Sequence, residues 1–226
     1  VAVIGAGYTG LWTAYYLKRR NPDMRIVVLE SQVAGFGASG RNGGWCSALL
    51  PMGFEAMAAT HGRDAATRMQ RAMNDAVDEV GRVVAAEGID CDYAKGGTLR
   101  SSRNPAHTGR LQAEIDEYRA FGFGEDDIRW MDAAEASATI AMTDTLGGIY
   151  TPHCAAIHPA KLVRALARTV EALGVTVHEQ TRVTAIEPRV YAEHLLFIDL
   201  PSTAILCVLA VFVQVLAPTK YVGYLM

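Results

Sequence analysis

The first thirty residues alternate between short apolar runs and one amphipathic stretch. Residues 1–4 and 25–29 are apolar runs that predict strands, and residues 11–20 between them carry apolar side chains at helical spacing. We expect this helix to end at Asn21, because Pro22 follows and cannot continue it. Two strands joined by a helical crossover predict a βαβ unit and therefore an α/β fold with a parallel sheet.

Helices and short strands are also predicted for most of the chain up to about residue 190. Further helices are expected over residues 62–87, 105–121 and 159–173, a capping box from Asp132 to Glu135 opens a shorter one, and strands are expected over 97–101, 147–151, 175–178 and 182–186. In the helix over 62–87, residues at three- and four-residue steps are expected to form core: Ala65, Met69, Ala72, Met73, Ala76, Val77, Val80, Val83 and Val84. Residues 31–54 are rich in glycine and are expected to be shaped around a ligand.

Composition narrows the classes of protein to consider. The chain has 226 residues, 50% of them hydrophobic and 20% charged, which suits one large or two small globular domains and not a disordered chain. The net charge is −3 and the basic residues are scattered, so we expect no nucleic-acid partner. The four cysteines form no CxxC pair, which predicts neither a zinc cluster nor a disulfide framework and favours a reducing, cytoplasmic compartment.

A glycine motif follows the first predicted strand. Gly5, Gly7 and Gly10 have the GxGxxG spacing of the dinucleotide-binding fingerprint, and they lie between a strand and a helix as that fingerprint requires. The first glycine permits a tight turn, the second lets the backbone approach a pyrophosphate, and the third allows close packing of helix on strand. The N-terminus of the following helix offers free N–H groups to phosphate oxygens.

An acidic residue completes the fingerprint. Glu30 ends the second strand twenty residues beyond Gly10, where a carboxylate can accept hydrogen bonds from the ribose hydroxyls of an adenosine. An acid at this position disfavours NADP, because its 2′-phosphate would meet a like charge. Glycine spacing and acid together predict a dinucleotide site but leave an NAD-linked dehydrogenase as an alternative.

The segment after Glu30 separates the cofactors. Residues 35–44 read GFGASGRNGG, and this run resembles the second flavin-contacting segment of FAD-dependent oxidoreductases of the D-amino-acid oxidase family. Ser39 can donate a hydrogen bond to the cofactor, Arg41 can neutralise phosphate or the electron-rich end of the flavin, and Gly43 and Gly44 let backbone amides approach a flat ring. The resemblance continues through residues 157–162 and 174–183.

This resemblance implies a Rossmann-like FAD-binding domain from residues 1–60 and 155–188, with residues 61–154 forming part of an α+β substrate domain. It also implies oxidation of an amine or amino acid by hydride transfer to the flavin. The expected cofactor-binding residues are Gly5, Ala6, Gly7, Thr9, Gly10, Glu30, Ser31, Ser39, Arg41, Asn42, Gly43, Gly44 and Val183. In the family, the main chain at the position of Val183 contacts the adenine.

Catalytic and metal-binding residues are not indicated. His153 and His158 lie five residues apart with no third ligand nearby in the sequence, so structural roles are expected for both. The sequence singles out no catalytic acid or base, no metal site and no oligomeric state.

The last part of the chain departs from the family pattern. The resemblance is expected to end near residue 188, and residues 200–217 carry no charge. These eighteen residues are long enough to span a membrane, but buried strands or a helix and a mis-joined reading frame are alternatives. The chain also begins inside a predicted strand, with no secretory signal, so we expect an incomplete chain. A non-catalytic truncated dinucleotide-binding module with a membrane-associated tail remains a second alternative function.

Overall fold

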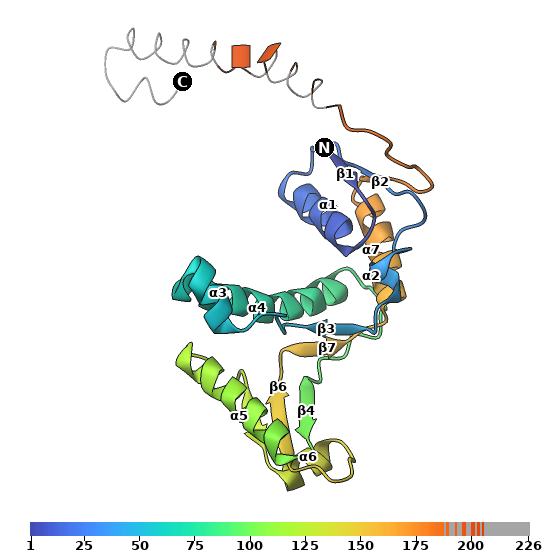
Figure 1. Ribbon diagram of the computed structural model, residues 1–226. Helices are drawn as coiled ribbons and strands as arrows, with labels where there is room; N and C mark the ends of the chain where they lie inside the picture. Colours follow the sequence, from blue (N-terminus) through green and yellow to red (C-terminus); the bar gives the residue numbers. More distant parts are fainter. Residues whose placement is uncertain are drawn as a thin grey trace, which may run out of the picture. The chain divides into compact units, whose positions relative to one another are not determined.

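The computed structural model describes residues 1–187 and eight positions beyond them, 189, 193, 196, 197, 200, 201, 203 and 205. The chain divides into two compact units, Val1–Arg182 and Val183–Met226, and the elements described below lie in the first (Figure 1). Most of the uncharged segment, residues 200–217, for which a membrane span was one of several interpretations, lies outside the described residues. Among those that are described, no helix has the length and apolar character needed to cross a membrane.

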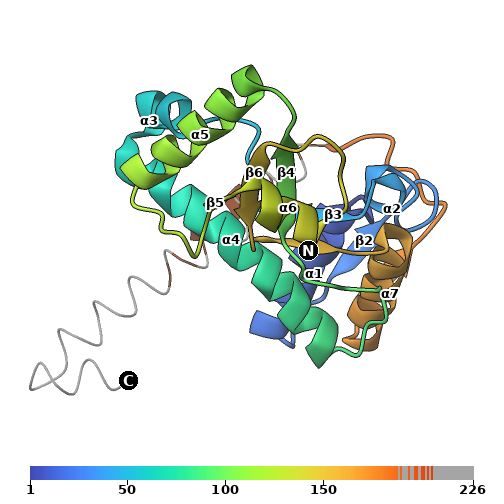
Figure 2. The ribbon, with the colours of Figure 1, turned by 90° about the horizontal axis from the view of Figure 1, so that it is seen from below.

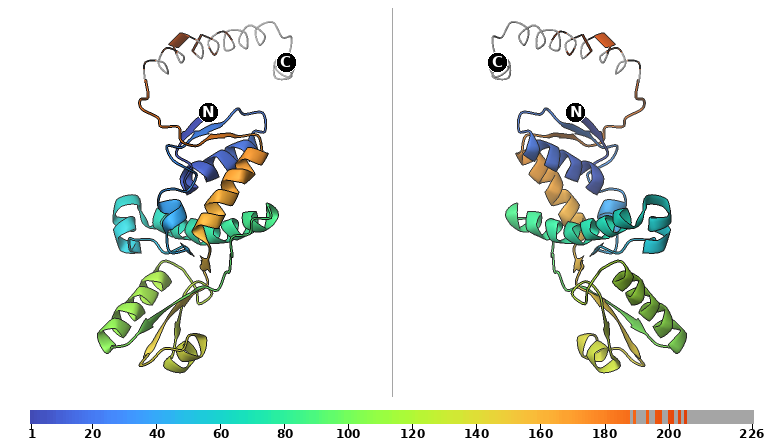
Figure 3. Two further views of the ribbon diagram at one scale, coloured as in Figure 1. Left: turned by 90° about the vertical axis from the view of Figure 1, so that its right-hand side faces the viewer. Right: turned by 90° about the vertical axis from the view of Figure 1, so that its left-hand side faces the viewer.

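The predicted βαβ unit is confirmed. Strands β1 (Ala2–Ile4), β2 (Val27–Leu29) and β8 (Thr176–His178) form a parallel sheet in the order β1-β2-β8, and helix α1 (Tyr8–Arg20) connects the first two. Helix α7 (Pro159–Ala172) lies beside α1 on the same face of this sheet (Figure 3). The buried side chains between these elements come from both helices and the sheet: Leu11, Ala14, Tyr15, Val28, Leu166 and Val170.

Two antiparallel sheets follow in the middle of the chain. Strands β3 (Trp45–Ser47) and β7 (Cys154–Ala156) pair with each other, and β4 (Thr98–Ser102), β6 (Gly147–Thr151) and β5 (Arg129–Met131) form the second sheet in that order. The helices of this part are α2 (Ala38–Arg41), α3 (Phe54–His61), α4 (Arg63–Ala86), α5 (Pro105–Ala120) and α6 (Ala133–Thr139). Figure 2 shows α3 and α5 near one end of α4, where an aromatic cluster joins them.

Two expectations about local structure were wrong. Residues 182–186 form no strand. In the first half of α4, Met69 is 51% exposed, whereas Gln70 and Asn74 are 3% and 6% exposed. These two amides are buried because the Gln70 side chain donates hydrogen bonds to the Ala48 carbonyl at 2.9 Å and to the Asn74 Oδ1 at 3.0 Å. Side-chain hydrogen bonding therefore outweighs the apolar pattern in setting the face that α4 buries.

Helices α1 and α4 are joined by two phenol–carboxylate hydrogen bonds. The Tyr15 hydroxyl donates to Glu87 at 2.6 Å, and the Tyr16 hydroxyl donates to Glu79 at 2.5 Å. Glu79 also accepts hydrogen bonds from Arg82. The Arg82 and Tyr16 hydrogen bonds lower the pKa of Glu79 from 4.5 to about 2. The charged form of this carboxylate is thus favoured by folding.

This pKa predicts a specific acid sensitivity. A carboxylate whose pKa is lowered by folding stabilises the native state above its ordinary pKa of 4.5, and this contribution is lost as the pH falls to about 2. As the pH falls from 4.5 to about 2, we expect the free energy of unfolding to decrease less in Glu79→Gln than in the unmodified chain. Urea denaturation at several pH values measures this. Glu171→Gln is the control, because the Glu171 side chain makes no hydrogen bond or ion pair to the described residues, and equal acid losses in all three chains would contradict the prediction.

Candidate cofactor site

The predicted glycine fingerprint forms a tight turn between β1 and α1. Gly5 has a φ of +94°, which disfavours a side chain, and its amide donates to the Leu29 carbonyl at 2.8 Å. Gly7 is the N-cap of α1. A Cβ on Gly10 would overlap the backbone carbonyl of Gly5, so the first turn of the helix packs directly on the turn before it. The three glycines themselves therefore add no side chain at the N-terminus of α1.

A second glycine turn repeats the first. Gly35 has a φ of +77°, Gly37 is the N-cap of the short helix α2, and a Cβ on Gly40 would overlap the Gly35 carbonyl. These three glycines have the same spacing as Gly5, Gly7 and Gly10. This second turn was not predicted, although the identical glycine spacing in the sequence is a signal for it.

The two turns meet at the N-terminus of α1. The Gly35 amide donates to the Ala6 carbonyl at 2.9 Å, and the Ser39 hydroxyl accepts from the Tyr8 amide at 2.9 Å. A Cβ on Gly7 would lie 2.9 Å from the Ser39 Oγ. Ser39 is therefore held where the helix N-terminus would receive a phosphate, and its own proton remains available to a phosphate oxygen. Thr9 is exposed in the first turn of the same helix.

Glu30 is fixed beside the first turn. Its carboxylate accepts hydrogen bonds from the amides of Ala6 at 2.8 Å and Gln32 at 2.9 Å and from the Ser31 hydroxyl at 3.3 Å. Partial burial opposes ionisation of Glu30, but these hydrogen bonds outweigh it and lower its pKa. Glu30 is thus an ionised acceptor at the end of β2, and Ser31 acts by orienting it.

The residues after α2 have different roles. Arg41 is exposed, and its guanidinium carbon lies 4.2 Å from the centre of the Phe36 ring. The Asn42 side chain donates to the carbonyls of Ala38 and Ser39 and accepts from the Gly44 amide at 2.9 Å. Asn42 therefore shapes the glycine segment through its backbone.

The local surface fits a dinucleotide with a flat ring system. A Cβ on Gly5, Gly37 or Gly43 would meet no atom within 4 Å, so these positions expose bare backbone. Phe36 and Trp45, which flank the segment from Gly37 to Gly43 in the sequence, are 46% and 54% exposed. Bare amides, a helix N-terminus, Ser39 and an ionised Glu30 match the pyrophosphate, the ribose and a planar ring.

Val183, the two histidines and the cysteines that the sequence analysis considered are each described by their own surroundings. Val183 belongs to the second unit, where it is half-buried in an irregular segment. His158 is the N-cap of α7, and its Nδ1 accepts from the Lys161 amide at 3.3 Å, which is a structural role. The His153 Nε2 lies 3.0 Å from the Asp127 Oδ1. Cys46, Cys91 and Cys154 are free thiols, and the described residues contain no group of three or more metal-ligating side chains.

Comparison with protein families gives a match over most of the chain. The DAO family model, described as FAD dependent oxidoreductase, matches residues 1–207. The match thus extends beyond residue 188, where the sequence resemblance was expected to end.

The curated relatives of similar sequence are also named as oxidoreductases. Gamma-glutamylputrescine oxidoreductase of Escherichia coli (strain K12) is 29% identical over 187 residues, which cover 83% of this chain and 43% of that protein. The probable oxidoreductase OrdL of Haemophilus influenzae is 26% identical over 183 residues, which cover 81% of this chain and 42% of that protein. The chain therefore spans less than half the length of these relatives.

Solved structures share the fold. Glycine oxidase from Bacillus cereus ATCC 14579 matches with a TM-score of 0.61 and 20% identity, over 82% of this chain and 47% of that one. L-proline dehydrogenase from P. horikoshii matches with a TM-score of 0.66 and 17% identity, over 82% of this chain and 45% of that one. At this level of identity the likeness establishes the architecture, which is the α/β fold expected from the sequence.

Proposed function

The chain belongs to the DAO family of FAD-dependent oxidoreductases, and from this membership we propose that its paired glycine turns hold FAD for the oxidation of an amine or amino acid. The observation that carries the proposal is the meeting of the two turns at the N-terminus of α1. There the Ser39 hydroxyl lies within 2.9 Å of the Tyr8 amide, with bare glycine backbone around it. A single glycine turn would serve any dinucleotide, and the second turn is the feature that favours a flavin over NAD.

Each part of the site has a separate task. The N-terminus of α1 and the Ser39 hydroxyl would hold the pyrophosphate, and Glu30 would accept hydrogen bonds from the ribose hydroxyls. The bare backbone at Gly43 would lie along the ring system, with Gly44 packed tightly behind it against the Ile157 carbonyl. Arg41 would supply positive charge near the phosphate or the ring. Val183 is proposed to contribute its main chain to the adenine end.

The chemistry is an oxidation at a carbon that bears nitrogen. When bound, FAD supplies the acceptor for the two electrons and the hydrogen that leave this carbon. With the loss of a proton from the nitrogen as well, the substrate becomes an imine, which water hydrolyses to a carbonyl compound and an amine or ammonia. The role of this chain is to bind and orient the cofactor, with residues 61–154 proposed to contribute to the substrate side. The substrate class is supported by the family and by the names of the relatives, which include a gamma-glutamylputrescine oxidoreductase and a glycine oxidase.

The two alternatives raised by the sequence are less well supported. An NAD-linked dehydrogenase would have no use for the second glycine turn, and the family match places the chain among flavin-dependent enzymes. The truncated module with a membrane tail depends on residues 200–217, most of which lie outside the described part of the chain.

Anaerobic mixing of the FAD-loaded protein with amines and amino acids tests the reaction. We expect at least one primary or secondary amine to bleach the flavin absorption. Dithionite serves as the positive control for reduction. Bleaching by dithionite but by no member of a broad panel of amines and amino acids would contradict the proposed reaction without affecting the cofactor assignment.

A further inference from the structure

Tyr8 is the first residue of α1, and it contacts two different parts of the chain around the candidate cofactor site. Its backbone amide donates to the Ser39 Oγ at 2.9 Å, at the end of the site proposed to hold the pyrophosphate. Its hydroxyl donates to the Pro159 carbonyl at 3.0 Å, at the start of α7 and 151 positions further along the chain. Tyr8 therefore connects the N-terminus of α1 directly to the N-terminus of α7.

The segment that Tyr8 reaches also supports the glycines proposed to lie along the ring system. The Ile157 amide donates to the Gly44 carbonyl at 2.9 Å. A Cβ on Gly44 would lie 2.2 Å from the Ile157 carbonyl oxygen and 3.5 Å from the Pro159 Cδ, so the backbone of Gly44 packs directly on this segment. The backbone at Gly44 is thus positioned by residues 157–159.

The Tyr8 side chain is held in place by packing and keeps its proton. Its ring is half-buried and packs against two buried apolar clusters, which include Leu166 and Leu162 of α7. Burial raises the pKa of Tyr8 to about 12, and a side-chain hydrogen bond with Asn42 lowers this pKa by less. The hydroxyl is therefore protonated at neutral pH and can donate to the Pro159 carbonyl.

The bond between Tyr8 and Pro159 differs in kind from the other contacts between α1 and α7. In the described part of the chain it is the only side-chain hydrogen bond between these two helices. The remaining contact is apolar packing, which includes Leu11 on α1 and Leu166 on α7. Apolar packing is not directional, whereas a hydrogen bond needs one donor and one acceptor in a defined geometry. The Tyr8 hydroxyl therefore fixes how the N-termini of the two helices are aligned.

We propose that Tyr8 is a positioning residue that aligns the pyrophosphate end of the FAD site with its ring end. The inference rests on the proposed function, in which the N-terminus of α1 holds the pyrophosphate and the backbone at Gly43 lies along the ring system. Without the hydroxyl, residues 157–159 and the glycine backbone packed on them would be free to shift relative to α1. FAD binding would then have to order this arrangement, which lowers affinity. A ligand that lacks the ring would not be affected.

Comparison of FAD with ADP tests the proposal. ADP carries the adenosine and the pyrophosphate but neither the ribityl chain nor the flavin. Both ligands are titrated into the unmodified chain and into Tyr8→Phe by isothermal titration calorimetry. We expect Tyr8→Phe to lower FAD affinity at least about fivefold, the effect of one hydrogen bond, and to change ADP affinity less than about twofold. A general loss of stability would not separate the two ligands in this way.

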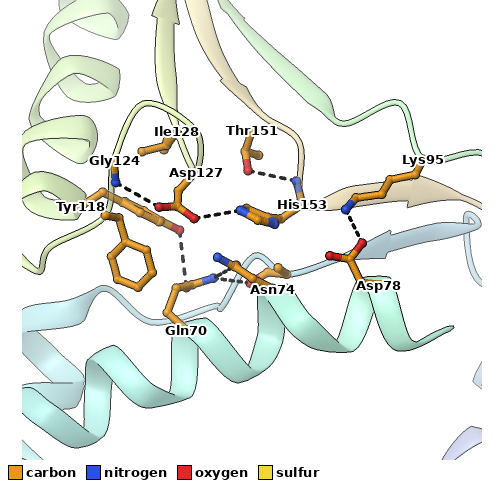
Figure 4. A network of polar contacts seen from close by, with 12 residues as sticks. Gln70, Asn74, Asp78, Lys95, Tyr118, Gly124, Asp127, Ile128, Thr151 and His153 are labelled. Carbon is orange, nitrogen blue, oxygen red and sulfur yellow. Dashed lines mark hydrogen bonds and ion pairs between the residues drawn. The ribbon is translucent and has the colours of Figure 1, made fainter. Parts of the chain in front are cut away.

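Two other tyrosines serve as controls. Tyr16→Phe removes a phenol hydroxyl from the same helix, where it donates to Glu79 on α4 at 2.5 Å. Tyr118→Phe removes a phenol hydroxyl from α5, where it lies 3.5 Å from the Gln70 Oε1 (Figure 4). Neither hydroxyl bonds to the glycine turns or to residues 157–159, so both variants should bind FAD and ADP as the unmodified chain does.

The possible results separate this inference from the proposed function. If the unmodified chain binds FAD and Tyr8→Phe binds it equally well, the positioning role alone is overturned. An equal loss of FAD and ADP affinity in Tyr8→Phe would also overturn it, because the effect would then lie at the pyrophosphate end. Failure of the unmodified chain to bind FAD would overturn the proposed function and the inference with it. Circular dichroism checks that Tyr8→Phe, which keeps its packed ring, is folded.

Discussion

Gly7→Val is expected to abolish retention of FAD while the chain still folds. The backbone of Gly7 is extended, which valine adopts readily, but a Cβ there would lie 2.9 Å from the Ser39 Oγ. In the free chain the Ser39 hydroxyl can rotate away, so the cost to folding is small. In the loaded chain the branched side chain would occupy the position of the pyrophosphate. We expect FAD affinity to fall at least about 100-fold, equivalent to about 3 kcal/mol.

Fluorescence titration of FAD measures this affinity, and circular dichroism checks the fold. Gly109→Val is the matched control, since Gly109 lies in α5 and a Cβ there meets nothing within 4 Å. It should bind FAD as the unmodified chain does. Unchanged FAD affinity in Gly7→Val would show that the pyrophosphate does not lie over the N-terminus of α1.

Gly10→Ala is expected mainly to lower the free energy of unfolding. Its methyl group would overlap the backbone carbonyl of Gly5, and it would also lie 3.2 Å from the Val3 Cγ1. A backbone carbonyl cannot rotate aside as a hydroxyl can, so α1 must move away from β1. Overpacking of this kind costs about 1–3 kcal/mol, and more where the backbone must shift. Alanine is better than glycine inside a helix by about 1 kcal/mol, which offsets only part of this cost.

We therefore expect Gly10→Ala to lower the free energy of unfolding by about 2 kcal/mol, measured by urea denaturation. Gly109→Ala is again the control and should keep or raise stability, because it gains helix propensity without a clash. A Gly10→Ala chain as stable as the unmodified one would mean that α1 does not pack on the Gly5 turn as described.

Long periodic segments and glycine spacing were the most informative parts of the sequence. They predicted α1, α4, α5 and α7, the parallel strand pair β1 and β2, and the capping box of α6, in which Asp132 and Glu135 bond to each other's backbone. The placement of Glu30 beside the first glycine turn also follows from chain order, because consecutive parallel strands end at the same edge of the sheet.

Other features depend on contacts between distant segments. The pairing of β3 with β7 joins residues more than a hundred positions apart, and three-residue strands carry too little pattern to be recognised. The burial of Gln70 depends on the position of the Ala48 carbonyl, which helical periodicity cannot supply. The pairing of His153 with Asp127 likewise requires the turn before β5 to meet the corner between β6 and β7. Such polar contacts are set by tertiary structure and have no local sequence signal.

If the two glycine turns hold FAD, the visible absorption spectrum of the chain will reveal the bound cofactor. The purified chain is incubated with excess FAD and passed through a gel-filtration column. We expect the protein peak to carry both flavin bands at about one FAD per chain, and we expect Gly7→Val to elute colourless. A colourless protein peak for the unmodified chain, with all FAD in the small-molecule fraction, would contradict this expectation.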